Sequence, residues 1–212
     1  MLGLSNLVSL TSTKTVNVMK TISKKLLVRA VSLAVGLILT SQLVLAQNYS
    51  LSGSPAITIA GTSTMHDWTM TSKEATCQAV IETDANGNPT RVTSLLITIQ
   101  AESLKSGKSA MDKNAYNALK TDKNKQITFQ LASAQISDKS VASSGNLTIA
   151  GTSKQTDVTA NFEVLGNKSI KFTGIKKIKM TEYKVEPPTF MFGSIKTGDD
   201  LTITYEITLV PK

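Results

Sequence analysis

Apolar and polar residues alternate along most of the chain after residue 56. The clearest example is Leu201, Ile203, Tyr205, Ile207 and Leu209, with Thr or Glu at each position between them. An apolar residue at every second position lies on one face of a β-strand. Similar sets occur at Ile57–Ile59, Trp68–Met70, Cys77–Ile81, Leu95–Ile99, Ile127–Leu131, Leu147–Ile149, Val158–Val164 and Ile170–Phe172. The pattern predicts about eight strands, each with one dry and one wet face.

Short polar connections separate these sets. The segments Asp84–Pro89 (DANGNP), Ser137–Ser140 (SDKS) and Leu165–Ser169 (LGNKS) contain the residues that tight turns require. Short turns between strands imply antiparallel hairpins. Eight antiparallel strands form either a two-layer sandwich or a closed barrel, and closure removes exposed strand edges. We therefore predict a barrel.

One segment has the period of a helix. Met111, Ala115 and Leu119 are spaced four residues apart, which places them on one apolar stripe and predicts a helix over Ser109–Lys120. Ser109, followed three residues later by Asp112, resembles a capping box at the start of this helix.

A second interruption covers residues 179–200. Pro187 and Pro188 exclude a central strand there, and we expect this loop to bury its aromatic residues. The predicted fold is mainly β: an eight-stranded antiparallel β-barrel, lipocalin-like in shape, with one α-helix and a Pro/aromatic loop.

The first 46 residues have the composition of a secretory signal peptide. They contain five basic and no acidic residues, then the apolar run AVSLAVGLIL, and they end at Ala46. A single membrane anchor is the alternative, but the apolar run is short of the roughly 20 residues that a spanning helix needs. We expect cleavage after Ala46, export to the periplasm, and a mature barrel domain over residues 47–212.

Cleavage of the signal peptide removes those five basic residues, and the formal net charge of the protein falls from +8 to +3. No basic stripe with interleaved aromatic residues remains, so nucleic acid is not an expected partner. The single cysteine, Cys77, cannot form an internal disulfide. It shares its alternating face with Ala79 and Ile81, which predicts a small buried hydrophobe; pairing between two chains is the alternative.

The stretch ITIAGTSTMHDW holds the chain's only histidine, His66, and its only tryptophan, Trp68. One histidine and one cysteine cannot form a Cys/His zinc site, and no cluster of carboxylates or G-x-S-x-G motif is present. The motif IAGTS recurs at Ile149–Ser153 without a histidine. This indicates that the motif marks the point where a strand passes into a turn, with its glycine serving the backbone geometry. We predict no catalytic residue, metal or cofactor; a small-molecule hydrolase that uses His66 is the alternative.

Four lysines cluster in the segment KFTGIKKIK, at Lys171, Lys176, Lys177 and Lys179. A solvated strand face is the simplest interpretation. The alternative is an electrostatic contact with an anionic head group, or a transient contact with a membrane surface.

Four segments together resemble the YceI-like, polyisoprenoid-binding family of exported bacterial proteins. They are GTSTMHDW, MDKNAYNALKTDKNKQITF, GNLTIAGTSKQTDV and KMTEYKVEPPTFMFGSIKTGDDLTITYEI. The match runs in order from about Ile57 to Leu209, which is nearly all of the mature chain. The resemblance implies an eight-stranded barrel with a long apolar tunnel that binds an isoprenoid-type lipid, such as a polyprenyl species or a quinone, without catalysis. The chain has Tyr183–Lys184 where the family has an aromatic-Gly pair, so its longer loop is expected to shorten or re-aim the tunnel.

Periodicity alone favours a barrel filled by its own side chains, which would suit a structural or stress-response domain without a ligand. The resemblance favours the tunnel instead. The predicted ligand-binding residues are Trp68, Ile97, Ile99, Met111, Leu119, Phe129, Leu131, Phe162, Phe172, Met180, Phe190, Phe192 and Tyr205. A Phe-to-Trp change at Phe129 or Phe162 is expected to shorten the preferred lipid chain.

Overall fold

The computed structural model describes residues 45–190 and 192–212. Their strands are β1 (Leu45–Ser63), β2 (Trp68–Ser72), β3 (Ala75–Thr83), β4 (Pro89–Gln100), β5 (Gln126–Ser137), β6 (Ser140–Ile149), β7 (Thr152–Val164), β8 (Ile170–Lys179), β9 (Thr189–Phe190) and β10 (Ile195–Pro211). The α-helix is α2 (Ser109–Leu119). The predicted signal peptide lies outside the described residues except for its last two, which begin β1. No helix among the described residues is long and apolar enough to span a membrane.

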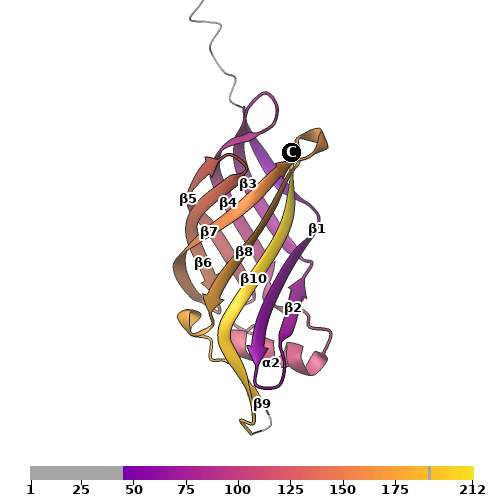
Figure 1. Ribbon diagram of the computed structural model, residues 1–212, viewed down its shortest axis with the longest axis vertical. Helices are drawn as coiled ribbons and strands as arrows, with labels where there is room; N and C mark the ends of the chain where they lie inside the picture. The colour runs from indigo at the N-terminus through magenta and orange to yellow at the C-terminus, as the bar shows by residue number, and fades with distance from the viewer. Residues whose placement is uncertain (1–44, 191) are drawn as a thin grey trace, which may run out of the picture. The chain divides into compact units, whose positions relative to one another are not determined.

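Eight of these strands form a closed antiparallel barrel, as predicted. The pairing order is β1-β3-β4-β5-β6-β7-β8-β10, and β10 pairs with β1 to close the sheet (Figure 1). β1 is 19 residues long, so its two halves pair with different strands on the same side: β3 with Leu45–Ser50 and β2 with Ile57–Gly61. β9 is a two-residue strand that pairs only with the start of β10.

The tight turns form where the sequence predicts them, each for a local reason. In the β3–β4 turn, the carboxylate of Asp84 accepts hydrogen bonds from the backbone N–H groups of Asn86 and Asn88 at 2.9 and 2.8 Å. In the β6–β7 turn, Ala150 and Gly151 both have positive φ, 48° and 78°, as a two-residue type I′ turn requires.

The two IAGTS copies have different backbone roles, which corrects the single role inferred from the sequence. The second copy contains the β6–β7 turn, whereas the first copy stays in strand β1 as far as Ser63. Identical residues therefore adopt different structures: the first copy ends its strand before the loop over residues 64–67, whereas β7 already begins at Thr152 inside the second copy.

Helix α2 begins at the predicted residue, but the predicted capping box is wrong. Ser109 is already helical, and Lys108 occupies the N-cap without a side-chain hydrogen bond. Asp112 instead accepts hydrogen bonds from the backbone N–H and the hydroxyl of Ser106, at 2.7 and 2.6 Å. These bonds hold the pKa of the Asp112 carboxyl below its ordinary value. The start of the helix is therefore tied to the preceding loop.

Buried apolar residues form two clusters, one toward each end of the barrel. The first surrounds Tyr49, Ile81, Ile170 and Leu209, each at most 1% exposed, and closes the end where the β3–β4 and β7–β8 turns lie. The second lies toward the end that α2 crosses and contains Met70, Leu104, Ile127, Leu147, Ile149, Ile178, Met180, Tyr183 and Val185, among others. The first end is thus tightly packed.

Cys77 lies in the first cluster, is 4% exposed and is a free thiol, as the alternation predicts. Burial raises the pKa of its thiol to about 12. The thiolate is the nucleophile, so almost none is present at about pH 8. We expect a disulfide reagent such as 5,5′-dithiobis(2-nitrobenzoate) to leave the native protein unlabelled at this pH and to label one thiol per chain in concentrated guanidinium chloride. Rapid labelling of the native protein would contradict the burial of Cys77.

Candidate functional site: an apolar cavity in the barrel

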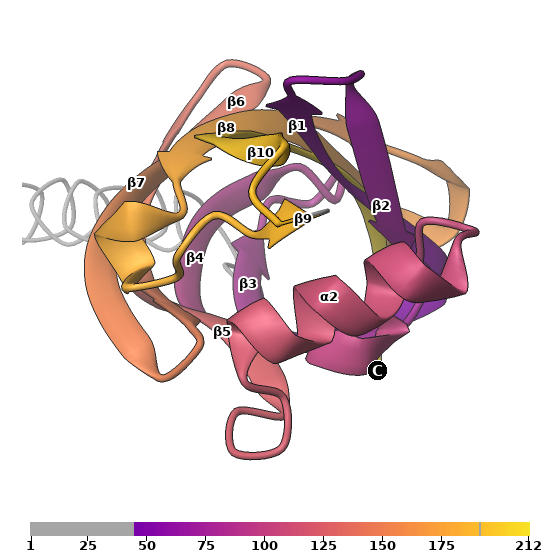
Figure 2. The same cartoon turned by 90° about the horizontal axis from the view of Figure 1, so that it is seen from below.

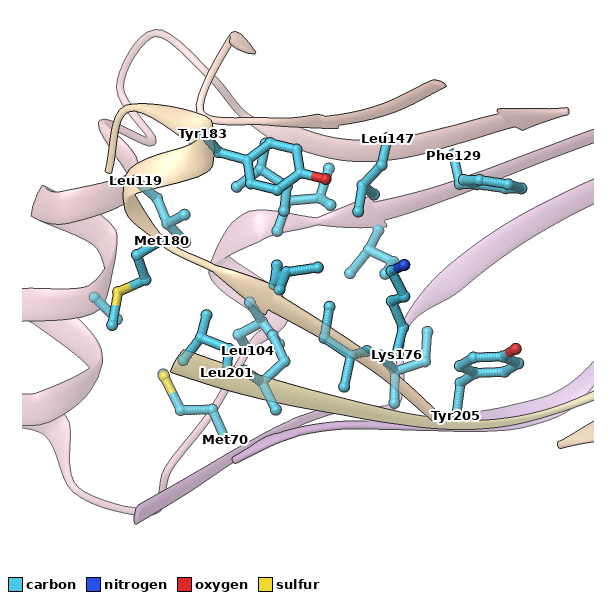
Figure 3. Close-up of a pocket in the computed structure, with 18 of the residues that line it drawn as sticks. Met70, Leu104, Leu119, Phe129, Leu147, Lys176, Met180, Tyr183, Leu201 and Tyr205 are labelled. Carbon is cyan, nitrogen blue, oxygen red and sulfur yellow. The ribbon is translucent and has the colours of Figure 1, made fainter. Parts of the chain in front are cut away.

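The barrel lumen contains a cavity of about 560 Å³. Its walls combine residues of the barrel strands with one face of α2 and the segment between β8 and β9. Figure 3 shows side chains such as Met70, Leu104, Leu147 and Leu201 surrounding this space. The volume lies within the roughly 300–1,000 Å³ typical of small-molecule sites. The interior is therefore not filled by its own side chains.

Eleven of the thirteen predicted ligand-binding residues line this cavity. They are Trp68, Ile97, Ile99, Met111, Leu119, Phe129, Leu131, Phe172, Met180, Phe190 and Tyr205. Their contact with a ligand stays a prediction.

The structure places the other two predicted residues elsewhere. Phe162 is buried beside Phe172, with ring centroids 6.2 Å apart, and belongs to the cluster that closes the far end. Phe192 is fully exposed in the turn between β9 and β10. The loop over residues 179–200 is expected to bury its aromatic residues. Tyr183, which is 2% exposed, confirms this expectation, whereas the exposed Phe192 contradicts it.

Three aromatic rings lie along the barrel wall because a glycine on a neighbouring strand leaves room for each. A Cβ atom on Gly61 would overlap the Trp68 ring, one on Gly145 would lie 2.6 Å from Cζ of Phe129, and one on Gly174 would overlap Tyr205. Any side chain at these glycines would push the rings away from the wall and into the lumen.

The polar atoms of these rings have partners in the backbone. Trp68 Nε1 donates to the Thr62 carbonyl at 3.0 Å, and the Tyr205 hydroxyl donates to the Thr159 carbonyl at 2.8 Å. Burial raises the pKa of Tyr205 to about 12, so its hydroxyl remains a neutral donor. The rings therefore present mainly carbon to the cavity.

Strands β7 and β8 separate near the middle of the barrel. Their pairing runs from Val164↔Ile170 to Ala160↔Gly174 and goes no further toward the end that α2 crosses. Beyond that point, the segment after β8 covers the gap. The Tyr183 hydroxyl lies 3.0 Å from the Thr156 hydroxyl of β7, and both residues are buried. The loop after β8 thus completes the wall that β7 leaves open.

Helix α2 forms part of the rim and is held by apolar contacts with the second cluster together with polar contacts. Met111, Ala115, Ala118 and Leu119 face the cavity, yet no residue of α2 is fully buried. The Tyr116 hydroxyl lies 2.8 Å from the Leu104 carbonyl and 2.7 Å from Lys105 Nζ. Figure 2 shows α2 across one side of this end and the segment leading to β9 across the other.

His66 lies at the rim of the cavity and is exposed. Its Nδ1 is 2.8 Å from the backbone carbonyl oxygen of Asp67. The cavity lining among the described residues contains no Asp, Glu or Cys that could activate His66 or accept a proton from it. The same part of the chain holds no group of three or more His, Cys, Asp or Glu residues arranged to bind a metal ion.

The sequence does not predict the polar residues of the cavity lining, and the most notable of them is Lys176. A solvated face is the simplest interpretation of Lys176 together with Lys171, Lys177 and Lys179, but Lys176 lines the cavity, whereas Lys177 and Lys179 are exposed. The alternating pattern does indicate this position, because Lys176 is four residues after the inward residue Phe172 and so lies on the same face of the strand.

Comparisons with known proteins agree with this architecture. A family model described as a YceI-like domain matches residues 48–209. BcnA of Burkholderia cenocepacia superposes with a TM-score of 0.60 at 16% identity, covering 73% of this chain and 95% of that one. A polyisoprenoid binding domain from Saccharophagus degradans gives 0.60 at 13% identity, covering 77% and 98%. A YceI protein of Campylobacter jejuni gives 0.52 at 23% identity, covering 64% and 81%. No curated protein matches the sequence significantly.

The packing of Tyr205 over Gly174 gives a stability test. In Gly174→Ala the new Cβ would collide with the Tyr205 ring and lie 2.7 Å from the Thr159 carbonyl oxygen. We expect the free energy of unfolding to fall by about 1–3 kcal/mol in urea titrations. Gly166→Ala is the matched control, because nothing lies within 4 Å of its Cβ position and its φ is not positive. Equal stability of the two variants would contradict the wall packing.

Proposed function

The chain belongs to the YceI-like family, and on that premise we propose that it binds an isoprenoid-type lipid in the barrel cavity and carries or sequesters it without catalysing a reaction. The observation that carries the proposal is the cavity of about 560 Å³, whose lining is almost entirely apolar. The similar domain from Saccharophagus degradans, which is described as binding a polyisoprenoid, supports the same ligand class.

The energetics of burial favour a long, thin ligand. Burial of one CH₂ contributes about 0.8 kcal/mol, so a five-carbon isoprene unit contributes on the order of 3–4 kcal/mol. Association costs roughly 4–15 kcal/mol in lost freedom of motion. Two or three buried units are therefore enough to offset the cost, without any directed polar contact.

The two alternative functions fit the structure less well. A domain with a filled core has no use for an open lumen, since an empty apolar cavity costs stability in proportion to its volume. A hydrolase that uses His66 would need a nucleophile and an orienting acid near the imidazole. Ser63 lies beside His66, but its hydroxyl donates to the His66 backbone carbonyl at 2.8 Å and not to the imidazole, and no carboxylate lines the cavity in the described part of the chain.

We propose export to the periplasm and transient docking of the cavity mouth on a membrane. Met65 and Phe192 are two large apolar residues left exposed at this end, 63% in the case of Met65. The hairpins that carry them are joined, because Thr64 N–H donates to the Lys196 carbonyl at 3.0 Å. Lys108 and Lys196 place positive charge at the same end. Apolar tips flanked by lysines suit an anionic lipid surface.

Extraction tests the ligand class. We expect organic extracts of the protein purified from its own cells to contain one isoprenoid-type lipid, seen by mass spectrometry. Phe129→Trp adds bulk inside the cavity and is expected to select a shorter chain, whereas Phe192→Trp, which lies outside the cavity, is expected to leave the chain length unchanged. Extracts without lipid would contradict the proposed function.

Transfer kinetics test the docking. Insertion of each exposed apolar side chain, Met65 or Phe192, into the membrane contributes about 1.5–3 kcal/mol to binding. We therefore expect the double variant Met65→Ser, Phe192→Ser to extract lipid from anionic vesicles at least about tenfold more slowly, with unchanged affinity in detergent. Leu165→Ser is the control, because Leu165 is also partly exposed but lies in the β7–β8 turn at the opposite end. Equal slowing in both variants would exclude docking through the mouth.

A further inference from the structure

One cationic side chain extends into the apolar lumen. Lys176 lies on β8 between Phe172, which belongs to the cluster at the closed end, and Ile178, which belongs to the cluster near the mouth. Its partner across the β8–β10 pairing is Ile203. Figure 3 shows the ammonium directed across the cavity toward the side of Phe129 and Leu147, beside Tyr205. The charge therefore lies partway along the lumen, inside the mouth.

The described part of the chain supplies no counter-ion for this charge. No Asp or Glu is among the described residues that line the cavity. The salt bridges of the described residues use Lys154, Lys171 and Lys179 of the nearby strands, and none uses Lys176. The Tyr205 hydroxyl, which lies beside Lys176 in Figure 3, donates its proton to the Thr159 carbonyl and makes no hydrogen bond with Lys176. Lys176 is thus half-buried without an acceptor among the described residues.

This position is unfavourable for folding alone. A half-buried ammonium loses part of its hydration, and only a close anion or several acceptors can replace that hydration. The other lysine of the cavity lining, Lys108, is exposed at the rim and keeps its contact with water. A methionine at position 176 would fill the same space without this cost.

We propose that Lys176 binds the acidic head group of the lipid, so that the natural ligand is a single-chain amphiphile with a carboxylate or phosphate rather than a neutral alcohol or quinone. The inference rests on the proposed function and narrows it. The charged head lies beside Lys176 inside the lumen, and the hydrocarbon chain follows the apolar walls. A charge-assisted hydrogen bond at this half-buried position is stronger than the same bond in water.

The test uses three probes with one tail: farnesoic acid, farnesyl phosphate and farnesol. Each probe displaces the neutral dye N-phenyl-1-naphthylamine from the full chain, and the dissociation constants are compared. We expect the wild type to bind at least one of the two acidic probes about tenfold more tightly than farnesol; the stronger of the two identifies the head group. In Lys176→Met this preference is expected to fall to about one while farnesol binding is retained.

Two matched variants locate the effect. Lys177→Met removes a neighbouring charge from the outer face, and Lys108→Met removes one from the rim; both are expected to keep the preference for acidic probes. Without ligand, Lys176→Met is expected to melt no lower than the wild type, because it removes an uncompensated charge. Equal binding of acid and alcohol, a preference lost in Lys108→Met instead, or a lower melting temperature of Lys176→Met would each overturn the inference. Failure of all three probes to bind would overturn the proposed function with it.

Discussion

The open lumen depends on how closely three aromatic rings approach the barrel wall. Trp68, Phe129 and Tyr205 all line the cavity. A glycine on the neighbouring strand lets each ring lie over bare backbone. Because two atoms cannot occupy one volume, the lumen stays open only while those positions carry no side chain. The cavity is therefore a consequence of steric exclusion at the wall.

The two ends of the barrel differ in what holds them. Apolar packing around Tyr49 and Ile170 closes one end, whereas at the other end the helix is held by partly buried apolar contacts together with polar contacts of Tyr116 and Asp112. Hydrogen bonds at an exposed rim compete with water and each contribute little to stability. Part of what holds the mouth can therefore be replaced by water, which suits the entry and exit of a ligand. A single cation deeper in the lumen then adds a chemical preference to a site shaped mainly by apolar contact.

Alternation predicts the strands of the barrel because the face on which a side chain lies depends only on whether its position along the strand is odd or even. Neighbouring residues in the sequence are enough to establish this. Helix α2 is predictable for the same reason. Parity cannot separate Phe129 from Phe162, since both point inward. Their different places follow from barrel closure, which puts Phe162 against Phe172 at the packed end. The exposure of Phe192 likewise depends on a hairpin that no local pattern specifies. Lys176 was within reach of the sequence, because its parity matches that of Phe172.

An experimental structure of the protein purified from its own cells tests the central claim most directly. We expect elongated density along the lumen between the walls that carry Leu104 and Tyr205, with its polar end beside Lys176. We also expect the Phe129 ring to lie against Gly145. A lumen occupied by the protein's own side chains, with the rings turned inward and no room for a chain, would contradict it.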